Sequence, residues 1–367
     1  MTQPGHTATS AHYGTLSHGD DVDLVRLASD TLQVDVITWG ARVVSILAPD
    51  RDGVPGEVTL GLADLAAYEQ DRRYFGPCVG RFANRIAGGA FELDGRRHQL
   101  PTNEGPTTLH GGPEGFDRRL WQAELGEGAS VRLHRVSDDG EMGFPGRLEV
   151  SVHYELDGSD LRVGYDARAS APTLVNLTNH TYFNLAGAGV VEDHVVRLDG
   201  DRYLPVDAAL NPTGELRPVD ATPFDLRTPV RLGDRLRSAD HQLSMTRGFD
   251  HTWVLVSDDA LQRRAQADTD VAQGRAARVE HPQSGRWLEV WTDRPGVQFY
   301  SGNFLDGTVV GREGTSYRQG DAFCLEPHHF PDAPHHEHFP SVVLRPGDVY
   351  RARDVYRFGT QPPAESS

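Results

Sequence analysis

Short segments of alternating polar and apolar residues, separated by glycine and proline, dominate this sequence. Residues 32–37, 43–47 and 147–156 alternate in this way. A period of two places successive side chains on opposite faces of a strand, whereas a helix needs a period near 3.6. With 39 glycines and 23 prolines punctuating such segments, long helices are excluded over most of the chain. The pattern predicts an all-β fold, a large antiparallel β-sandwich with a few short helices.

Three hairpins and two short helices are predicted. In the clearest hairpin, residues 147–156 return as residues 161–165 through Asp157-Gly158, a pair typical of tight turns. Two further hairpins are expected to join residues 287–291 to 297–300 and residues 341–344 to 348–352, and the helices to cover residues 60–69 and 261–272.

No internal repeat and no convincing linker divides the chain, so residues 1–367 are predicted to form a single domain. Polar residues at about 1–14 and 360–367 are expected to form short flexible tails. Residues 1–14 lack a basic start followed by an apolar run, and no segment approaches the length of a membrane span. We therefore expect a soluble, cytoplasmic protein, monomeric or homodimeric.

Charge and composition exclude several classes of function. The formal net charge is −17, which argues against nucleic acid or an anionic membrane as a partner. All 36 basic residues are arginine. Without lysine, Schiff-base chemistry, lysine-anchored pyridoxal phosphate and a Walker-type phosphate loop are all impossible. The two cysteines, Cys78 and Cys324, are expected to be buried free thiols.

One segment, residues 176–187, sets a histidine among amides and hydroxyls. His180 lies there with three asparagines, two threonines and Tyr182, while Leu177, Phe183 and Leu185 can anchor the segment in a core. Such a histidine can move a proton near neutral pH. A hydrogen-bonded core histidine is the alternative.

Glu326 is the candidate carboxylate partner. It follows the apolar residues 322–325 and precedes Pro327, which ends a strand. Burial at such a position raises the pKa of a carboxyl group and makes it a competent base near neutral pH. A salt bridge to an arginine is the alternative.

Further polar residues lie in glycine-rich or strand-like surroundings. Asn84 and Arg85 belong to residues 80–86, His110 to the glycine-rich residues 107–112, Asp250 to residues 248–251 and Gln298 to residues 297–300. Glycine allows the backbone to approach a ligand closely. A loop histidine without a ligand and a solvated arginine remain the simpler interpretations of His110 and Arg85.

A histidine-rich run raises the question of a metal. His328, His329, His335, His336 and His338 follow Glu326 closely. Their spacing matches no helical zinc motif, and four prolines in residues 327–340 make the segment an irregular loop. We therefore predict no metal site, and a solvated histidine-rich loop.

Taken together, these motifs resemble the aldose 1-epimerase (galactose mutarotase) family. The resemblance runs from about residue 13 to residue 358 and has the motifs in the family's order. They are GRFANRI at 80–86, LHGG at 109–112, NHTYFNL at 179–185, GFDH at 248–251, QFYSGNF at 298–304 and LEPHHFPD at 325–332. Any one of them is modest evidence, whereas six in order are strong. The resemblance implies a β-sandwich, in agreement with the strand pattern.

The resemblance also implies roles for individual residues. Glu326 matches the general base and His180 the general acid of an enzyme that interconverts the α and β anomers of free aldohexoses such as glucose and galactose. The residues that match sugar ligands are Asn84, Arg85, His110, Tyr182, Asp250 and Gln298. The substrate is then a monosaccharide, and no cofactor or metal is implied. His328 departs from the glutamine common at that position, and residues 335–338 depart from a loop commonly rich in asparagine and proline.

The implied chemistry consists of two proton transfers. The anomeric hydroxyl loses a proton while the ring oxygen gains one, the ring opens, and rotation about the C1–C2 bond precedes reclosure. We expect Glu326 to be ionised and His180 protonated at the start.

Several alternatives stay open at this point. A glycoside hydrolase could pair Asp250 with Glu326. A hexose-6-phosphate epimerase would need an arginine cluster at the pocket mouth, for which Arg81 and Arg85 are candidates. A catalytically silent sugar-binding module and a metal-dependent β-sandwich enzyme are the others.

Overall fold

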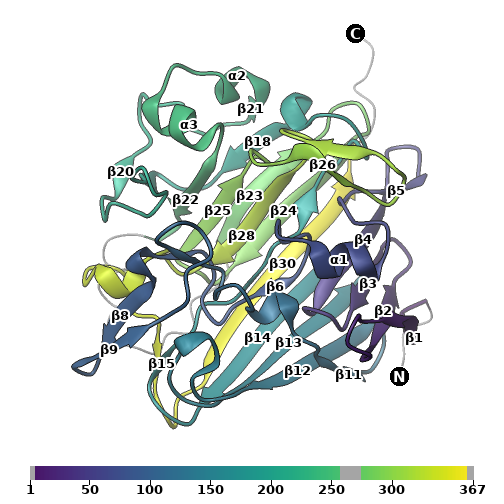
Figure 1. The fold of residues 1–367 in the computed structure, drawn as a ribbon. Helices are drawn as coiled ribbons and strands as arrows, with labels where there is room; N and C mark the ends of the chain where they lie inside the picture. The colour runs from purple at the N-terminus through teal and green to yellow at the C-terminus, as the bar shows by residue number, and fades with distance from the viewer. Residues whose placement is uncertain (1–4, 257–273, 362–367) are drawn as a thin grey trace.

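Two large antiparallel sheets make up most of the molecule (Figure 1). The structure is a computed structural model and describes residues 5–256 and 274–361. In order across the larger sheet, the nine strands are β11 (Gln122–Leu125), β12 (Ser130–Ser137), β13 (Leu148–Asp157), β14 (Asp160–Ala169), β30 (Tyr350–Thr360), β24 (Arg286–Thr292), β23 (Gly274–Glu280), β18 (Val195–Leu198) and β21 (Val230–Arg231).

The second sheet has six strands and carries the polar motifs. In order they are β17 (Tyr182–Phe183), β28 (Phe323–His328), β25 (Gly296–Tyr300), β22 (Asp250–Val254), β19 (Arg202–Leu204) and β20 (Arg217–Pro218). A third sheet is a meander of five strands, β1 (Thr7–Thr15), β2 (Asp21–Ala28), β3 (Gln33–Ile37), β4 (Arg42–Pro49) and β5 (Pro55–Glu57).

Smaller elements connect these sheets. The two-stranded pairs are β6 (Cys78–Val79) with β16 (Thr178–Asn179), β7 (Arg85–Ile86) with β10 (Thr108–Leu109), β8 (Ala90–Leu93) with β9 (Arg96–Gln99), β15 (Thr173–Leu174) with β29 (Val343–Leu344), and β26 (Asp306–Val310) with β27 (Ser316–Arg318). Within residues 5–256 and 274–361, the helices are α1 (Leu65–Gln70), α2 (Gly233–Leu236) and α3 (His241–Thr246), with 3-10 turns at Ala87–Gly89, Phe116–Arg118, Glu141–Gly143, Val191–Asp193 and Ala333–His335.

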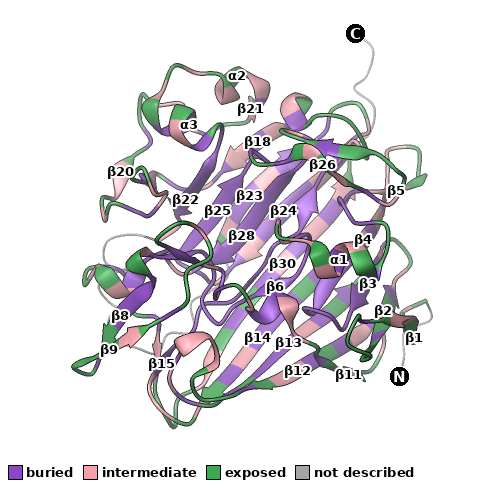
Figure 2. Ribbon diagram, viewed as in Figure 1, coloured by how far each residue is buried: buried purple, intermediate pink, exposed green. Residues whose placement is uncertain are grey.

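Side-chain alternation decides which face of each strand enters the core. On β28, Phe323 and Leu325 pack in the main hydrophobic core with Val290 of β24 and Tyr356 of β30. The alternate positions of β28 therefore face the other side of the sheet. Figure 2 shows β22, β25 and β28 buried along most of their length, so this second face is covered as well. The predicted all-β antiparallel fold is confirmed.

The three predicted hairpins have different outcomes. The one through Asp157-Gly158 is confirmed: β13 pairs with β14, and Gly158 has a φ of +59°. The other two predictions are wrong. Strand β24 pairs with β23 and β30, whereas β25 pairs with β22 and β28 in the other sheet. Likewise β29 pairs with β15, and β30 with β14 and β24. In both cases the short connection crosses between sheets, which alternation does not reveal.

The predicted ends and helices also need correction. The flexible tail expected at residues 1–14 is wrong for residues 7–14, because β1 pairs with β2 over Thr7–Thr15. At the other end, β30 continues to Thr360. Helix α1 covers the second half of the segment predicted helical at residues 60–69. It begins at Leu65 and is capped by Asp64, whose side chain accepts from the Ala67 amide at 2.9 Å. The helix predicted at residues 261–272 lies outside the described residues.

Among the described residues, no helix is long and apolar enough to cross a membrane.

Candidate active site

The outer face of the six-stranded sheet arranges polar side chains in rows. Glu326 on β28 lies opposite Gln298 on β25, which lies opposite Thr252 on β22. In the next row, Cys324 lies opposite Tyr300, which lies opposite Asp250. Because a strand has a period of two, residues separated by one position on each strand share this face. Glu326, Gln298 and Asp250, far apart in the sequence, are thus brought together by strand register.

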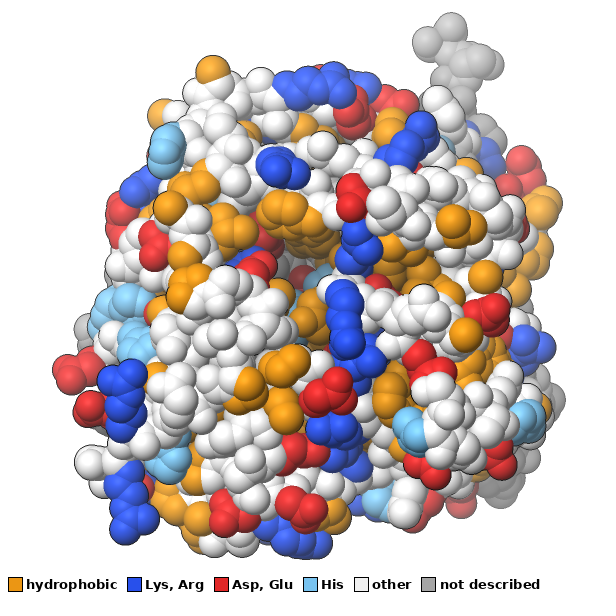
Figure 3. Space-filling view, viewed as in Figure 1, with side chains coloured by type: hydrophobic (Ala, Val, Ile, Leu, Met, Phe, Trp, Pro, Cys, Tyr) orange, Lys and Arg blue, Asp and Glu red, His pale blue; other side chains and the backbone are white. Residues whose placement is uncertain are grey.

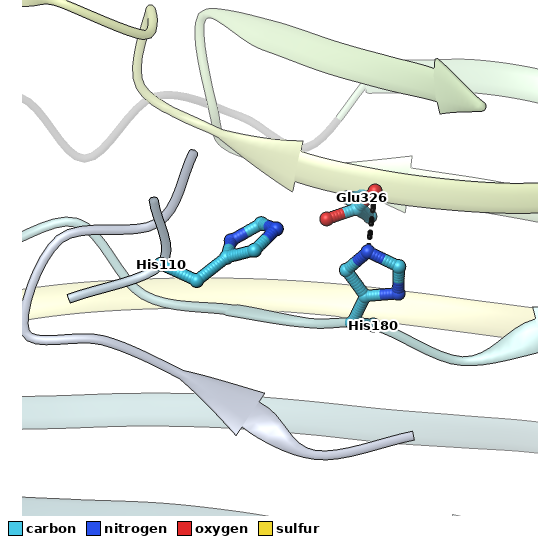
Figure 4. Close-up of side chains that lie close together, drawn as sticks. All are labelled: His110, His180 and Glu326. Atoms are coloured by element: carbon cyan, nitrogen blue, oxygen red, sulfur yellow. Dashed lines mark ion pairs between the residues drawn. The ribbon is translucent and has the colours of Figure 1, made fainter. Parts of the chain in front are cut away.

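His180 approaches Glu326 from the segment between β16 and β17. Its Nε2 lies 3.6 Å from Oε1 of Glu326 (Figure 4). The backbone around it is fixed on both sides: the His180 amide donates to the Pro77 carbonyl at 3.0 Å, and the Gly76 amide donates to the His180 carbonyl at 2.9 Å. His180 is 5% exposed and Glu326 2%. The two predicted proton-transfer groups therefore face each other in a buried setting.

The pairing of β7 with β10 brings Asn84 and His110 together. The His110 amide donates to the Asn84 carbonyl at 3.0 Å, and the Asn84 amide donates to Nδ1 of His110 at 3.1 Å. Both residues have positive φ, 63° for Asn84 and 51° for His110, a conformation that costs free energy and is concentrated at functional sites. Since Nδ1 accepts, the neutral ring carries its proton on Nε2 and can donate there to a ligand.

Arg85 and Asp250 form the polar end of the site. Arg85 makes a bidentate contact with Glu104, at 2.5 and 3.0 Å, and its Nη2 lies 3.7 Å from Oδ2 of Asp250. Asp250 also accepts from Nε2 of Gln298 at 2.7 Å, and the Oε1 of Gln298 accepts from the Thr252 hydroxyl at 2.6 Å. These contacts hold charged and amide groups in fixed directions, as binding of vicinal hydroxyls requires.

Tyr182 meets the site through its ring. Its hydroxyl donates to the Arg73 carbonyl at 2.7 Å, while its ring centroid lies 5.1 Å from that of His180 and 4.7 Å from that of Phe75. The geometry supports a role in holding the His180 ring, and the sugar contact expected for Tyr182 stays a prediction.

Burial reverses the charges expected for the central pair. It lowers the pKa of His180 to about 4, and together with the Asp250 carboxylate it raises the pKa of Glu326 well above its usual range. In the free protein, burial therefore disfavours a protonated His180 beside an ionised Glu326, and the ion pair expected at the start of the reaction stays a prediction. A neutral imidazole beside a carboxylic acid is favoured. Both arrangements hold one proton between the two groups, so a single transfer from Glu326 to His180 interconverts them.

The chemistry of the ligand atoms bears on the metal alternative. One ligand atom from each of His110, His180 and Glu326 lies within 4.8 Å of the others, close enough to hold a metal ion. However, a histidine binds a metal through an unprotonated nitrogen, and the Asn84 amide directs the proton of His110 to Nε2. That arrangement suits a hydrogen-bond donor to an oxygen better than a metal ligand.

The histidines after His329 do not reach the site. His335 and His336 contact the Asp332 carboxylate at 2.6 and 3.6 Å, and His338 contacts the Gly214 carbonyl at 2.8 Å. His328, by contrast, lies fully buried on β28, in the row next to that of Glu326. The loop thus holds surface segments together, and only His328 belongs to the face that carries the site.

Four neighbours of the site were not predicted from the sequence as site residues. The Tyr74 ring lies 4.6 Å from that of His110, and Glu104 binds Arg85. Neither had a signal in the sequence. Thr252 and Cys324 lie two positions from Asp250 and Glu326, so the period-two alternation could have identified them.

The space-filling view shows where the site opens. Figure 3 shows a hollow in the face of the molecule, at the place where Figure 1 draws β25 and β28, with histidine and acidic side chains visible inside it. Acidic and basic residues both border the opening.

Comparisons with known proteins agree on one family. A family model described as aldose 1-epimerase matches residues 23–357. The chain is 46% identical to the galactose mutarotase of Homo sapiens over 355 residues, which cover 96% of this chain and 98% of that protein. It is 37% identical to the aldose 1-epimerase of Escherichia coli (strain K12) over 329 residues, 89% and 91% of the two chains. The crystal structure of galactose 1-epimerase from Lactobacillus acidophilus NCFM superposes with a TM-score of 0.83 at 28% identity, covering 97% and 99% of the two chains. The chain belongs to the aldose 1-epimerase family.

Proposed function

We propose that this protein interconverts the α and β anomers of free aldoses, with galactose and glucose among its substrates. The observation that carries the proposal is the buried pair of His180 and Glu326, 3.6 Å apart, on a face that also presents Asp250 and Gln298. The likeness to galactose mutarotases supports galactose as a substrate.

The reaction needs one group that takes a proton and one that gives a proton. Transfer of the shared proton from Glu326 to His180 prepares a carboxylate and an imidazolium. Glu326 then takes the proton of the C1 hydroxyl, whose O–H electrons become the second bond of the C1 carbonyl. The C1–O5 bond breaks, and its electrons on O5 take the proton from Nε2 of His180. Rotation about C1–C2 and the reverse steps give the other anomer, with no net consumption of protons.

Neighbouring residues hold the sugar and stabilise charge. His110 donates from Nε2, Arg85 donates from its guanidinium, and Asp250 accepts. Arg85 also favours the ionised form of Glu326, against the effect of burial. Asn84 and Gln298 supply amide groups, which can both donate to and accept from sugar hydroxyls.

The geometry also separates the proposal from its alternatives. A sugar phosphate needs free positive charge, but Arg85 is already paired with Glu104 and Asp250. Arg81 donates instead to the carbonyls of Ser137 and Gly146. A glycoside hydrolase needs two carboxylates as its reacting groups, whereas Glu326 faces a histidine. A binding module without catalytic activity does not need an acid–base contact such as that between His180 and Glu326.

Removing either proton-transfer group should abolish most of the activity. We expect Glu326→Gln and His180→Asn each to lower kcat by about 10²–10⁴-fold, the range for a positioned acid or base. Polarimetry on freshly dissolved α-glucose and α-galactose measures the rate above the spontaneous one, and circular dichroism checks the fold.

Glu289→Gln is the matched control, because Glu289 is a buried carboxylate on β24 that pairs with Arg275 and Arg278 away from the site. It should keep the wild-type rate. Wild-type turnover by Glu326→Gln would contradict the assignment of the base, and inactivity of the wild-type protein on every aldose tested would contradict the function.

A further inference from the structure

Strand β28 contacts both ring nitrogens of His180. Glu326 faces Nε2, and two positions earlier the Sγ atom of Cys324 lies 3.6 Å from Nδ1. The two side chains share one face of the strand because they are separated by a single residue. The ring of His180 is thus set between a carboxyl group and a thiol from the same strand.

Cys324 has surroundings that keep it a neutral thiol. It is fully buried, and lies opposite Tyr182 on one side and Tyr300 on the other. Burial raises the pKa of Cys324 well above its usual range. A neutral thiol is a weak donor and a weak acceptor, so it can contact Nδ1 in either protonation state of that nitrogen.

We propose that Cys324 is a positioning residue for the acid–base reaction, which orients the His180 ring through Nδ1 without fixing its protonation state. The inference rests on the proposed function of His180. A carboxylate at this position would stabilise the protonated ring and raise its pKa, as the aspartate of a serine protease stabilises the imidazolium that forms during its reaction. Because His180 must give up its proton to O5 and take it back in the same turnover, a partner of low hydrogen-bonding strength suits both halves of the reaction.

Titratable and charged groups surround this ring on several elements. Those facing or acting on His180 are Glu326, Cys324 and His328 on β28, His110 after β10, Tyr74, Tyr182 on β17, Tyr300 on β25 and, further off, Arg42. A change at Cys324 that leaves the others in place therefore tests the contact with Nδ1 alone.

Two substitutions at Cys324 are expected to shift the pH dependence of kcat in opposite directions. Activity falls at low pH when His180 becomes protonated beside an already protonated Glu326, because the pair then lacks a base. A serine hydroxyl accepts from Nδ1–H more strongly than a thiol, so Cys324→Ser should move this acid limb of kcat to higher pH. Cys324→Ala removes the acceptor and should move it to lower pH, each by roughly half a unit. Both should lower kcat by about 3- to 10-fold and change KM by less than about 2-fold.

Cys78 provides the matched control. It is equally buried, lies on β6 and packs in the main hydrophobic core. Cys78→Ser and Cys78→Ala should leave the acid limb unchanged. The proposal is overturned if the Cys324 variants give the same pH profile as the Cys78 variants. A wild-type protein without mutarotase activity is a different result, and overturns the proposed function instead.

An infrared measurement tests the contact without any substitution at Cys324. The S–H stretch falls in a region free of other protein bands and shifts with hydrogen bonding, and this protein has only two thiols. We expect one of the two bands to move in His180→Asn, and the other to stay. If neither band moves, Cys324 does not interact with the ring.

Discussion

At the scale of the residue, Gln298 takes its orientation from two neighbours on β22. Its Oε1 accepts from the Thr252 hydroxyl at 2.6 Å, and its Nε2 donates to Asp250 at 2.7 Å. An amide side chain can otherwise rotate by half a turn and exchange its donor and acceptor. Asp250 accepts from the amide nitrogen, and the Thr252 hydroxyl holds the amide oxygen in the matching orientation.

Replacing Thr252 with valine should weaken sugar binding while leaving proton transfer intact. We expect Thr252→Val to raise KM by roughly 3- to 10-fold, as for the loss of one hydrogen bond, with a smaller change in kcat. Thr178→Val is the control, since the Thr178 hydroxyl is buried without a hydrogen-bond partner. Initial rates across a range of galactose concentrations measure both parameters. An unchanged KM in Thr252→Val would show that the orientation of Gln298 does not matter for binding.

At the scale of the element, alternation predicted strands well and their partners poorly. It placed β13, β14, β24 and β25, but not the fact that β24 and β25 belong to different sheets. Register is set by packing between distant strands, which a single sequence does not display.

The same distinction holds for the site. His180 was predicted as a candidate because it lies among amides and hydroxyls, and Glu326 because it follows an apolar run; the structure places His180 beside Glu326. The effect of burial on their pKa values could not be predicted, because it depends on how deeply both groups lie in the folded protein. Glu104 was missed because it contacts the site through Arg85, nineteen positions before it, and no motif of the sequence connects the two.

Arg81 and Arg85 belong to one motif but have different roles, one in the stability of the fold and one at the site. The Arg81 guanidinium is buried and donates to the carbonyls of Ser137, Asp138 and Gly146, which holds the β12–β13 connection in place. We expect Arg81→Lys to destabilise the fold by roughly 2–4 kcal/mol, because an ammonium group cannot reproduce this planar fork of donors. KM should not change.

Urea unfolding measures this loss, and Arg85→Lys is the comparison. Arg85 contacts Glu104 and Asp250 at the site, so its replacement should raise KM. A rise in KM for Arg81→Lys with unchanged stability would reverse these roles.

At the scale of the whole molecule, the single domain expected for residues 1–367 stays a prediction.

Burial keeps several titratable groups of the molecule neutral. Burial raises the pKa values of Asp117, in the Phe116–Arg118 turn, and of Asp354, on β30, to about 7. It lowers those of the buried His194, His251 and His328 to about 3. The buried aspartates therefore make the fold less stable as the pH rises, and the buried histidines make it less stable as the pH falls. A comparison of variants can separate the two effects.

Asp117→Asn should stabilise the protein increasingly as the pH rises to neutrality. Asp117 has a folded pKa of about 7 and an ordinary value of 3.8, so its contribution is fully present below pH 3.8 and is lost as the pH rises toward 7. Asparagine stays neutral throughout. The difference in free energy of unfolding between variant and wild type should therefore grow from about pH 4 to about pH 7 and then stay constant, reaching on the order of 4 kcal/mol at about 1.4 kcal/mol per pKa unit.

Thermal unfolding at matched ionic strength across this range measures the difference, in which the histidine contributions cancel because both proteins share them. Asp52→Asn is the control for the loss of a carboxylate, since Asp52 is exposed. A difference for Asp117→Asn that does not change with pH would mean that the Asp117 carboxyl is ionised in the folded protein. The buried Arg42 would then have to stabilise that charge, since its guanidinium already reaches the Asp117 carbonyl at 3.1 Å.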